Sequence, residues 1–267
     1  MKYSNGKYFL VGGGPAVRSM GEPLMGHFIA EAGGRDAKIM IITAGTNDPA
    51  EVNACYWEIF ESWGVTKLFS PKIFSRHDAQ ADWLYDRIIE CNGVFIAGGS
   101  QYKLSQRLND TPVEYGIRAI LERGGIVGGT SCGASIFAGP MILSGGNNNA
   151  HLRKDMIEIG KGFGILGQDI AIDTHCASRG RLPRIISFLT EHPGVLAIGL
   201  DEDTALLING NGNTKVLGDN AAYFLDSANM DLAHKETLHD EHLCASGIIL
   251  HALTAGDSYN LQTRTPC

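Results

Sequence analysis

A serine on a glycine-rich turn is the residue of this sequence best suited to covalent chemistry. Gly129-Thr130-Ser131-Cys132-Gly133 fits the pattern G-x-S-x-G, in which glycines let the backbone turn sharply and expose the serine hydroxyl at a sheet edge. Ser131 holds the nucleophile position, because Cys132 lacks a glycine two residues away on either side. Such turns also occur for packing reasons alone, so the motif predicts a nucleophile only if the chain supplies partners for it.

Candidate partners for this serine are present further along the chain. A serine nucleophile needs a base within hydrogen-bond reach, a carboxylate that orients the base, and two backbone N–H groups facing the developing oxyanion. His175 follows an apolar, strand-like run, and Glu202 lies in an acidic corner beyond it. Gly99 ends another such run, so its N–H and that of Cys132 are candidates for the oxyanion hole. Together these residues predict acyl transfer by a Ser-His-Glu triad.

Four other carboxylates compete with Glu202 for the role of orienting acid. Asp201 and Asp203 flank it, and Asp155 and Glu158 lie in a polar stretch upstream. Alternating side-chain directions along a strand turn Glu202 to the face opposite both flanking aspartates. We therefore predict Glu202 as the acid, and a solvated corner for the two aspartates beside it.

Strands and helices alternate along most of the chain before the acidic corner. Short apolar runs, several of them followed by glycines, are typical of buried strands, and longer stretches have helical spacing. Strands are expected at 8–11, 38–45, 65–69, 93–99, around 126–127 and at 169–173. Helices are expected at 20–32, 50–63, 79–90, 101–108, 113–123 and 182–190. This alternation predicts an α/β fold whose mostly parallel central sheet is buried on both faces, with ligand chemistry at the carboxyl ends of its strands.

Two regions depart from the alternation. The stretch 144–161 is polar and rich in glycine and asparagine, and we expect a surface loop or lid there. In the C-terminal third the pattern changes to antiparallel β-hairpins. These are expected to use strands within 195–208 and at 214–217, 221–225 and 247–253, with a tight turn at 209–212.

Composition limits the class of protein. A chain of 267 residues, 44% hydrophobic and 19% charged, is suited to one soluble domain over 1–267. No apolar run approaches the roughly 18 residues of a membrane span, and the first apolar run is too short for a signal peptide. A net charge of −7 without a basic stripe argues against nucleic acid as a partner. Six widely spaced cysteines without a C-x-x-C motif are expected to be reduced, as in the cytoplasm.

Neither a cofactor nor a metal ion is expected. The run Gly12-Gly13-Gly14 lacks the later glycine of a dinucleotide-binding loop and the lysine of a phosphate loop, so it predicts a tight turn near the active-site face. His234, His239 and His242 lie close to acidic residues, but their spacing matches no zinc signature. A solvated acidic loop is the preferred interpretation of that region.

Four blocks of sequence, in order, resemble the cyanophycinase branch of the S51 serine peptidases, and the resemblance covers most of the chain. The blocks are Ala97-Gly98-Gly99-Ser100-Gln101, Gly129-Thr130-Ser131-Cys132-Gly133-Ala134, 173–184 (DTHCASRGRLPR) and 199–205 (GLDEDTA). The resemblance implies a class I glutamine-amidotransferase-like three-layer α/β/α fold and a homodimer. It also implies cleavage of β-aspartyl-arginine dipeptides from cyanophycin, a polyaspartate backbone with arginine on each side-chain carboxyl.

The resemblance also assigns roles to residues. It implies that Ser131 is the nucleophile, His175 the base and Glu202 the orienting acid. The substrate pocket that it implies comprises Gln101, Asp173, Thr174, Arg179, Arg181 and Arg184. A substrate with free carboxylates suits this assignment, because a guanidinium group binds a carboxylate through two parallel hydrogen bonds. The alternative for the arginines is a helix start whose side chains pair with surface acids.

Four positions differ from the family pattern, and all four line the implied pocket. Thr174 and Cys176 stand where the family has Gln and an aromatic residue, and Ser100 and Cys132 stand where it has Asp and Ala. The prediction is a serine-type hydrolase acting on cyanophycin. An aspartyl or isoaspartyl dipeptidase for short peptides and a non-catalytic ligand-binding module are the alternatives.

Overall fold

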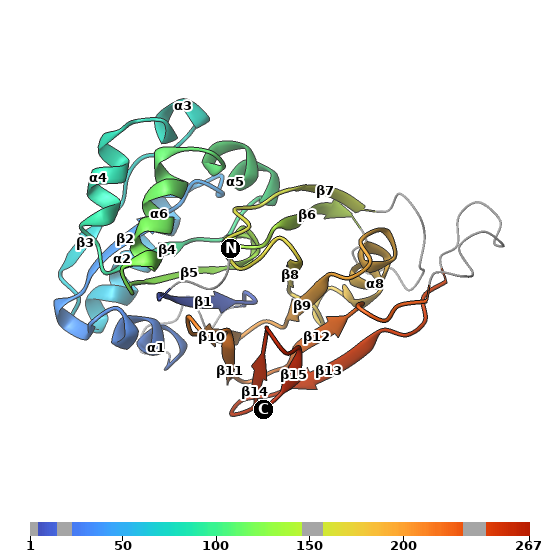
Figure 1. The fold of residues 1–267 in the computed structure, drawn as a ribbon. Coiled ribbons are helices and arrows are strands. Elements are labelled where there is room, and N and C mark those ends of the chain that lie inside the picture. Colours follow the sequence, from blue (N-terminus) through green and yellow to red (C-terminus); the bar gives the residue numbers. More distant parts are fainter. Residues whose placement is uncertain (1–4, 15–22, 146–156, 232–243) are drawn as a thin grey trace.

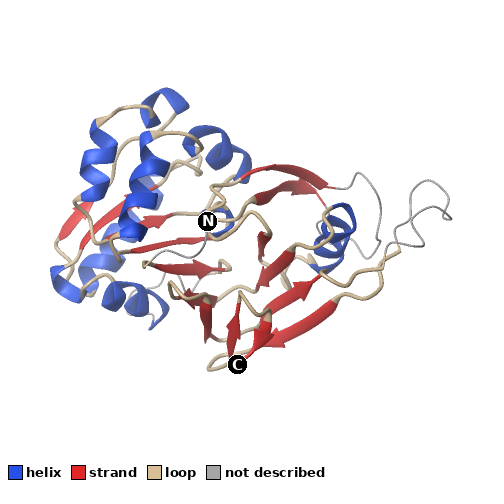
Figure 2. Ribbon diagram, in the orientation of Figure 1, coloured by secondary structure: helices blue, strands red, loops and turns tan. Residues whose placement is uncertain are grey.

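The computed structural model describes residues 5–14, 23–145, 157–231 and 244–267, which form three β-sheets and the helices around them (Figure 1, Figure 2). The strands are β1 Lys7–Val11, β2 Lys38–Ile42, β3 Lys67–Phe69, β4 Gly93–Ile96, β5 Ile126–Thr130, β6 Pro140–Gly145, β7 Ile157–Lys161, β8 Ile170–Thr174, β9 Leu196–Leu200, β10 Thr204–Ile208, β11 Asn213–Gly218, β12 Ala222–Asp226, β13 Ile249–Leu253, β14 Ser258–Asn260 and β15 Thr265–Pro266. The largest sheet has the order β15-β14-β11-β10-β1-β5-β4-β2-β3, the second has the order β13-β12-β9-β8, and β6 and β7 form the third.

The strands β1, β5, β4, β2 and β3 run parallel and are covered on both faces. Alternation along β1 sends Tyr8 and Leu10 into one hydrophobic core and Phe9 and Val11 into the other. The first core contains residues of α4, α5 and α6, and the second contains residues of α1 and α2. The predicted α/β fold with a large, mostly parallel central sheet is therefore confirmed, and its parallel part has three layers.

The helices mostly follow the predicted spacing. They are α1 Pro23–Glu31, the 3-10 helix η2 Gly34–Asp36, α2 Pro49–Ser62, α3 Arg76–Ala79, α4 Trp83–Ile89, α5 Gln101–Leu108, α6 Pro112–Glu122, α7 Cys132–Ser135 and α8 Leu182–Glu191. The single helix expected at 79–90 is instead two helices. Ser75 and Asp78 form a capping box that starts α3 before residue 79, and α4 begins separately at Trp83. None of the helices in the described ranges is long and apolar enough to cross a membrane.

The prediction of a surface loop at 144–161 is wrong at both of its ends. β6 and β7 pair there as an antiparallel hairpin, with an irregular register between Ile142 and Ser144. Polar residues do not prevent a strand when one face is solvated, and most residues of β7 are half-buried or exposed. Residues 146–156 lie outside the described part of the chain.

The prediction that 195–208 forms a hairpin is also wrong. β9 pairs with β8 in parallel and with β12, whereas β10 pairs with β1 and β11 in the nine-stranded sheet. Both strands are apolar and largely buried, and such runs carry no information about which strand is their partner. The acidic corner at 201–203 therefore connects two sheets. The hairpin of β10 and β11 around the turn 209–212 follows the prediction.

Candidate active site

Ser131 lies on a sharp turn between β5 and the short helix α7. Its backbone has φ 54° and ψ −126°, and its N–H donates to the carbonyl of Val11 over 2.9 Å. The turn is possible only because its glycines lack side chains. A Cβ on Gly129 would overlap the carbonyl oxygen of Gly133, and a Cβ on Gly133 would overlap that of Ile96. The predicted strand-turn-helix context of Ser131 is therefore present.

His175 and Glu202 approach Ser131 from the second sheet. His175 follows β8, and its Nε2 lies 2.9 Å from Ser131 Oγ. Its Nδ1 lies 2.6 Å from Glu202 Oε1, in the corner between β9 and β10. The structure thus brings the three predicted residues into one hydrogen-bonded series. This is the order that nucleophilic catalysis requires: nucleophile, base and orienting carboxylate.

The glycine run after β1 is the surface against which the base packs. The carbonyl of Gly12 accepts a hydrogen bond from His175 N over 3.0 Å, and that of Gly13 accepts one from Asp203 N over 2.8 Å. A Cβ on Gly13 would lie only 2.6 Å from His175 Nε2. The sequence predicted a tight turn near the site but not this contact. The three consecutive glycines are the sequence signal for this contact, because a backbone without side chains can approach the imidazole ring closely.

Burial and hydrogen bonding set the charge states of the base and the acid. Burial lowers the pKa of His175 below its usual 6.5, and the nearby Arg179 acts in the same direction, against the opposite effect of Glu202. The pKa of Glu202 is lowered chiefly by its hydrogen bond with His175 and also by one from Ser178. At neutral pH the site therefore holds a neutral imidazole beside an ionised carboxylate, which is the state in which His175 can accept a proton.

Backbone strain is concentrated around this site. In the described part of the chain, five non-glycine residues have a positive φ, and Ser131, His175 and Asp203 are among them. Such conformations cost on the order of 1–3 kcal/mol each and persist only where the surroundings enforce them. Here the surrounding glycines and backbone hydrogen bonds do so.

A buried charged cluster lies at the end of β8. Arg184 Nε donates to Asp173 Oδ2 over 2.6 Å, and Arg181 Nη1 donates to Asp173 Oδ1 over 3.3 Å and to the carbonyl of Thr174 over 2.8 Å. All three charged side chains are buried. Among the described residues, the acid with which Arg181 and Arg184 pair is therefore an internal aspartate. Arg179 differs from them, because it is exposed.

The other predicted pocket residues, Gln101 and Thr174, lie near the carboxyl ends of β4 and β8. Gln101 begins α5 and is half-buried. The loop before it passes close to Ser131, because a Cβ on Gly98 would lie 3.2 Å from the Cβ of Ser131. Thr174 is fully buried, and its Oγ1 has no hydrogen-bond partner among the described residues.

Cys132 follows Ser131 in the sharp turn between β5 and α7, called the elbow from here on, and it is fully buried. Burial raises the pKa of its thiol to about 12, although the N–H groups of Gly99 and Gly133 act against the shift. The neutral thiol is thus close to Gly99, a residue of the predicted oxyanion hole. Cys176 is also buried, and burial raises its pKa to about 12.

Two of the rival acids, Asp201 and Glu158, have other hydrogen-bond partners. Asp201 is buried, contrary to the solvated corner predicted for it, and it accepts hydrogen bonds from Ala177 N and from the hydroxyl of Tyr223. Glu158 accepts one from Ser144 Oγ over 3.1 Å. Asp155 lies outside the described residues, as do His234, His239 and His242. Within the described ranges, no group of three or more His, Cys, Asp or Glu side chains is arranged to hold a metal ion.

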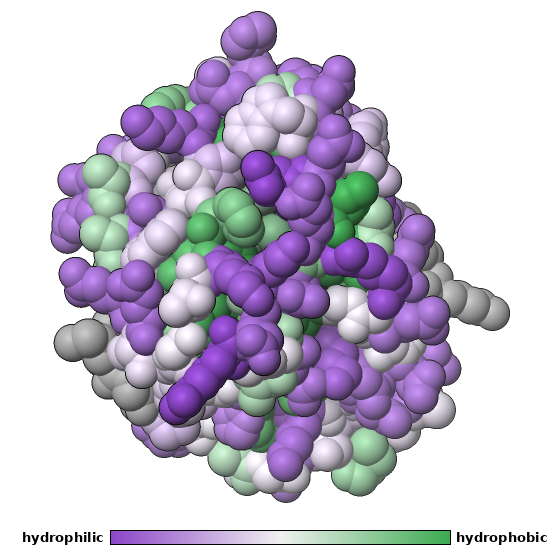
Figure 3. All heavy atoms as spheres, turned by 90° about the vertical axis from the view of Figure 1, so that its left-hand side faces the viewer, coloured by the Kyte–Doolittle hydropathy of each residue, from purple (hydrophilic) through white to green (hydrophobic). Residues whose placement is uncertain are grey.

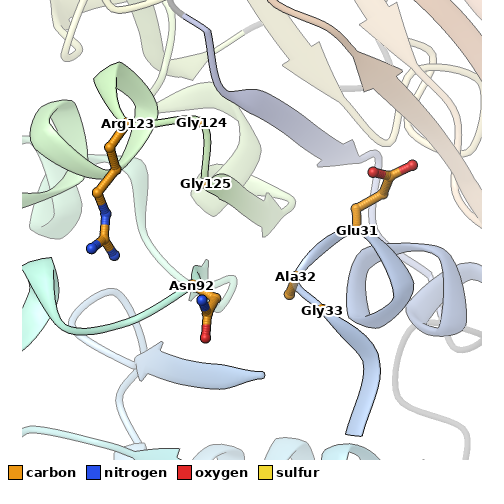
Figure 4. A pocket seen from close by; sticks show the side chains of 7 residues that line it. All are labelled: Glu31, Ala32, Gly33, Asn92, Arg123, Gly124 and Gly125. Carbon is orange, nitrogen blue, oxygen red and sulfur yellow. The ribbon is translucent and has the colours of Figure 1, made fainter. Parts of the chain in front are cut away.

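A hollow of about 300 Å³ lies at the opposite edge of the parallel sheet from the elbow (Figure 4). It is lined by Glu31, Ala32, Gly33, Asn92, Arg123, Gly124 and Gly125. Gly125 precedes β5, whereas Ser131 follows it, so the strand separates the hollow from the nucleophile. At roughly 3.3 Å per residue, that separation is far beyond side-chain contact. The hollow is therefore not part of the candidate active site.

The fold and the Ser-His-Glu series together define the class of serine-type hydrolases on an α/β sheet. The model of Peptidase family S51 matches residues 9–216. The cyanophycinase of Synechococcus elongatus is 35% identical over 94% of this chain and 78% of its own length, and that of Trichormus variabilis is 32% identical over 96% and 86%. The crystal structure of a peptidase from an acI-B1 actinobacterium has a TM-score of 0.68 at 20% identity, covering 98% of this chain and 99% of that one.

This chain belongs to peptidase family S51, and it is a serine-type peptidase. The predicted family is thereby confirmed. The roles of the individual site residues stay predictions.

Proposed function

We propose that this peptidase hydrolyses cyanophycin to β-aspartyl-arginine dipeptides with Ser131, His175 and Glu202 as its triad. The observation that carries the proposal is the hydrogen-bonded series of the three side chains, with 2.9 Å between Ser131 Oγ and His175 Nε2 and 2.6 Å between His175 Nδ1 and Glu202 Oε1. The names of the relatives support the choice of substrate.

The proposed reaction proceeds through an acyl-enzyme. Ser131 Oγ attacks the scissile carbonyl carbon while its proton passes to His175 Nε2, and Glu202 stabilises the imidazolium that forms. The N–H groups of Gly99 and Cys132 bind the oxyanion. His175 then protonates the leaving amine as the tetrahedral intermediate collapses. Water, deprotonated by His175, attacks the acyl carbon in turn, and Ser131 recovers its proton as the acid product leaves.

Substrate recognition in this proposal is divided among the arginines. Arg179 is the exposed one, so it is the clamp for a free carboxylate of the substrate backbone. Arg181, Arg184 and Asp173 act from the interior, because their mutual ion pairs hold the end of β8 against the start of α8. Gln101 supplies an amide at the mouth of the pocket.

A short β-aspartyl peptide is the second candidate substrate. The observation in its favour is that Thr174 is fully buried, so this position offers no side-chain amide to a long substrate where the resemblance predicts Gln. Cytoplasmic location and a homodimer also belong to the proposal. All six cysteines are free thiols, which fits a reducing compartment.

Two experiments test this function. Cyanophycin, β-Asp-Arg, β-Asp-Lys and α-Asp peptides are offered to the purified protein, and release of β-Asp-Arg from the polymer is the expected result. Hydrolysis of the short peptides alone selects the second candidate. A serine-directed phosphonate is expected to label the wild type but not Ser131→Ala. An unlabelled but folded wild type contradicts the triad.

A separate measurement tests whether the protein is a homodimer. Phe74, Trp83 and Tyr115 are each more than half exposed, on or near the helices α3, α4 and α6. The face of the molecule turned to the viewer in Figure 3 mixes apolar with hydrophilic residues. Light scattering coupled to size exclusion is expected to give twice the chain mass of 28.7 kDa, and the monomer mass contradicts the homodimer.

A further inference from the structure

A serine outside the triad contacts its acid. Ser178 Oγ donates to Glu202 Oε1 over 3.0 Å, and this is the oxygen that lies 2.6 Å from His175 Nδ1. We propose that Ser178 is a positioning residue that fixes the carboxylate of Glu202 against the imidazole. The inference rests on the proposed function, since it assigns to Ser178 a role within the same triad.

The hydroxyl of Ser178 has a choice of two acceptors. It lies 3.4 Å from the carbonyl oxygen of His175 and 3.0 Å from the carboxylate. A hydroxyl has one proton to donate, and hydrogen bonds to an ionised acceptor are shorter and stronger than those to a neutral one. The carboxylate is therefore its principal acceptor.

The segment that carries Ser178 is itself firmly held. Ala177 N donates to Asp201 Oδ1 over 2.7 Å, Cys176 N donates to the carbonyl of Leu200 over 3.0 Å, and Tyr223 Oη donates to the other oxygen of Asp201 over 3.2 Å. Asp201 is buried, so this anchor is shielded from water. Ser178 thus approaches Glu202 from a rigid turn, which is what a positioning role requires.

Glu202 needs such a contact because its side chain is about one-third exposed. Its backbone carbonyl is fixed by Asn220 Nδ2 over 2.9 Å and by Thr204 Oγ1 over 3.1 Å. These bonds leave the three side-chain torsions of the glutamate free to rotate, and that freedom has an entropic cost when the carboxylate is held at the imidazole. A second fixed donor at Oε1 removes most of that freedom before substrate binds.

The test uses a pair of variants that differ in one functional group. Ser178→Thr keeps the hydroxyl and Ser178→Val replaces it with a methyl of nearly the same shape, and the exposure of position 178 leaves room for both. Loss of a hydrogen bond to a charged group predicts a roughly tenfold fall in kcat for Ser178→Val and Ser178→Ala at unchanged KM, with Ser178→Thr close to the wild type. Ser246→Ala, an exposed serine remote in sequence from the site, is the control.

A second readout needs no substrate. The proton between His175 Nδ1 and Glu202 is expected to give a far-downfield proton NMR signal that Glu202→Gln abolishes. This signal is expected to persist in Ser178→Thr and to weaken or move in Ser178→Val. The pH profile of the same variants reports the titration of His175 and Glu202, and the charges of Arg179 and Arg181 face this pair.

These outcomes distinguish the positioning role of Ser178 from the proposed function. Equal kcat values and equal NMR signals for Ser178→Thr and Ser178→Val overturn the positioning role, whatever the substrate. A wild type that cleaves no member of the peptide panel contradicts the proposed function, while the NMR comparison still decides the role of Ser178.

Discussion

The two halves of the active site are held in place by different means. Ser131 belongs to the nine-stranded sheet, and close backbone approaches at Gly129 and Gly133 fix its turn. His175 ends a strand of the four-stranded sheet, and charged hydrogen bonds around Asp173 and Asp201 fix the turn that follows it. Steric exclusion thus positions the candidate nucleophile, and buried polar pairing positions the candidate base. The two halves should therefore fail in different ways when they are mutated.

The largest expected effect comes from the polar half. Asp173→Asn removes the buried carboxylate with which Arg181 and Arg184 pair, and breaking a buried ion pair typically costs about 3–5 kcal/mol of unfolding free energy. The measurement is urea unfolding followed by circular dichroism. Asp169→Asn is the control, because Asp169 pairs with Arg264 at the surface and its loss should cost no more than about 1 kcal/mol. Similar losses of unfolding free energy for both variants would show that the buried cluster stabilises the fold no more than a surface ion pair. That result contradicts buried polar pairing as the means that holds the half with His175.

The next effect tests the contact between the two halves. Gly13→Ala pushes a methyl group into the imidazole of His175, and we expect kcat/KM to fall about 100-fold, as for a misplacement of about 1 Å. Gly33→Ala is a matched control, since both glycines have φ +110° but the space around Gly33 is open. Steady-state kinetics on the cleaved substrate, together with the melting temperature, separates the shared backbone strain from the displaced base. Equal activity of the two variants contradicts the proposed packing role.

A smaller effect concerns recognition and not architecture. Arg179→Ala removes the exposed guanidinium, and kcat/KM for anionic substrates should fall about tenfold with no loss of folding stability. Arg87→Ala, another arginine with an exposed side chain, serves as the comparison. Unchanged kinetics in Arg179→Ala would eliminate the carboxylate clamp. A lowered melting temperature would show that Arg179 belongs to the structural cluster of its neighbours.

The smallest expected effect is the dependence of kcat/KM and of folding stability on pH. Because burial lowers the pKa of His175, kcat/KM should fall only as the pH drops below the usual imidazole value of 6.5. The sign for stability follows from proton binding. The unfolded imidazole takes up its proton first on acidification, so the contribution of His175 is present above pH 6.5 and is lost as the pH falls through the lowered pKa. Glu202 also has a lowered pKa, so it adds stability that disappears at still lower pH. A pH-rate profile whose acid limb lies above pH 6.5 contradicts the prediction that the imidazole of His175 is neutral at pH 7.

The sequence predicted local features better than the relations between sheets. The elbow at Ser131 and the helix Gln101–Leu108 follow from glycine spacing and apolar periodicity, which act over a few residues. The course of β9 into β10 was missed, because a buried apolar strand pairs equally well with any neighbour that covers it. The role of Asp201 was missed for a related reason, since its partners Ala177 and Tyr223 are distant in sequence.

The candidate site shows the same division. The residue types of Ser131, His175 and Glu202 and their places in the motif blocks were sufficient to nominate them. Their mutual distances depend on the docking of two sheets, which no local pattern encodes. The arginine cluster shows the limit most clearly. Arg179 is exposed while Arg181 and Arg184 are internal, although all three lie within six residues of one another.

The corner between β9 and β10 also determines when a newly made chain completes the proposed triad. Val11 pairs in register with Ala205, so the strand that follows Glu202 finds its place only against a strand near the N-terminus. A growing chain that has not yet reached β10 has the candidate nucleophile but lacks a seated Glu202. Under the proposed triad, activity therefore requires a chain that has been made beyond β10.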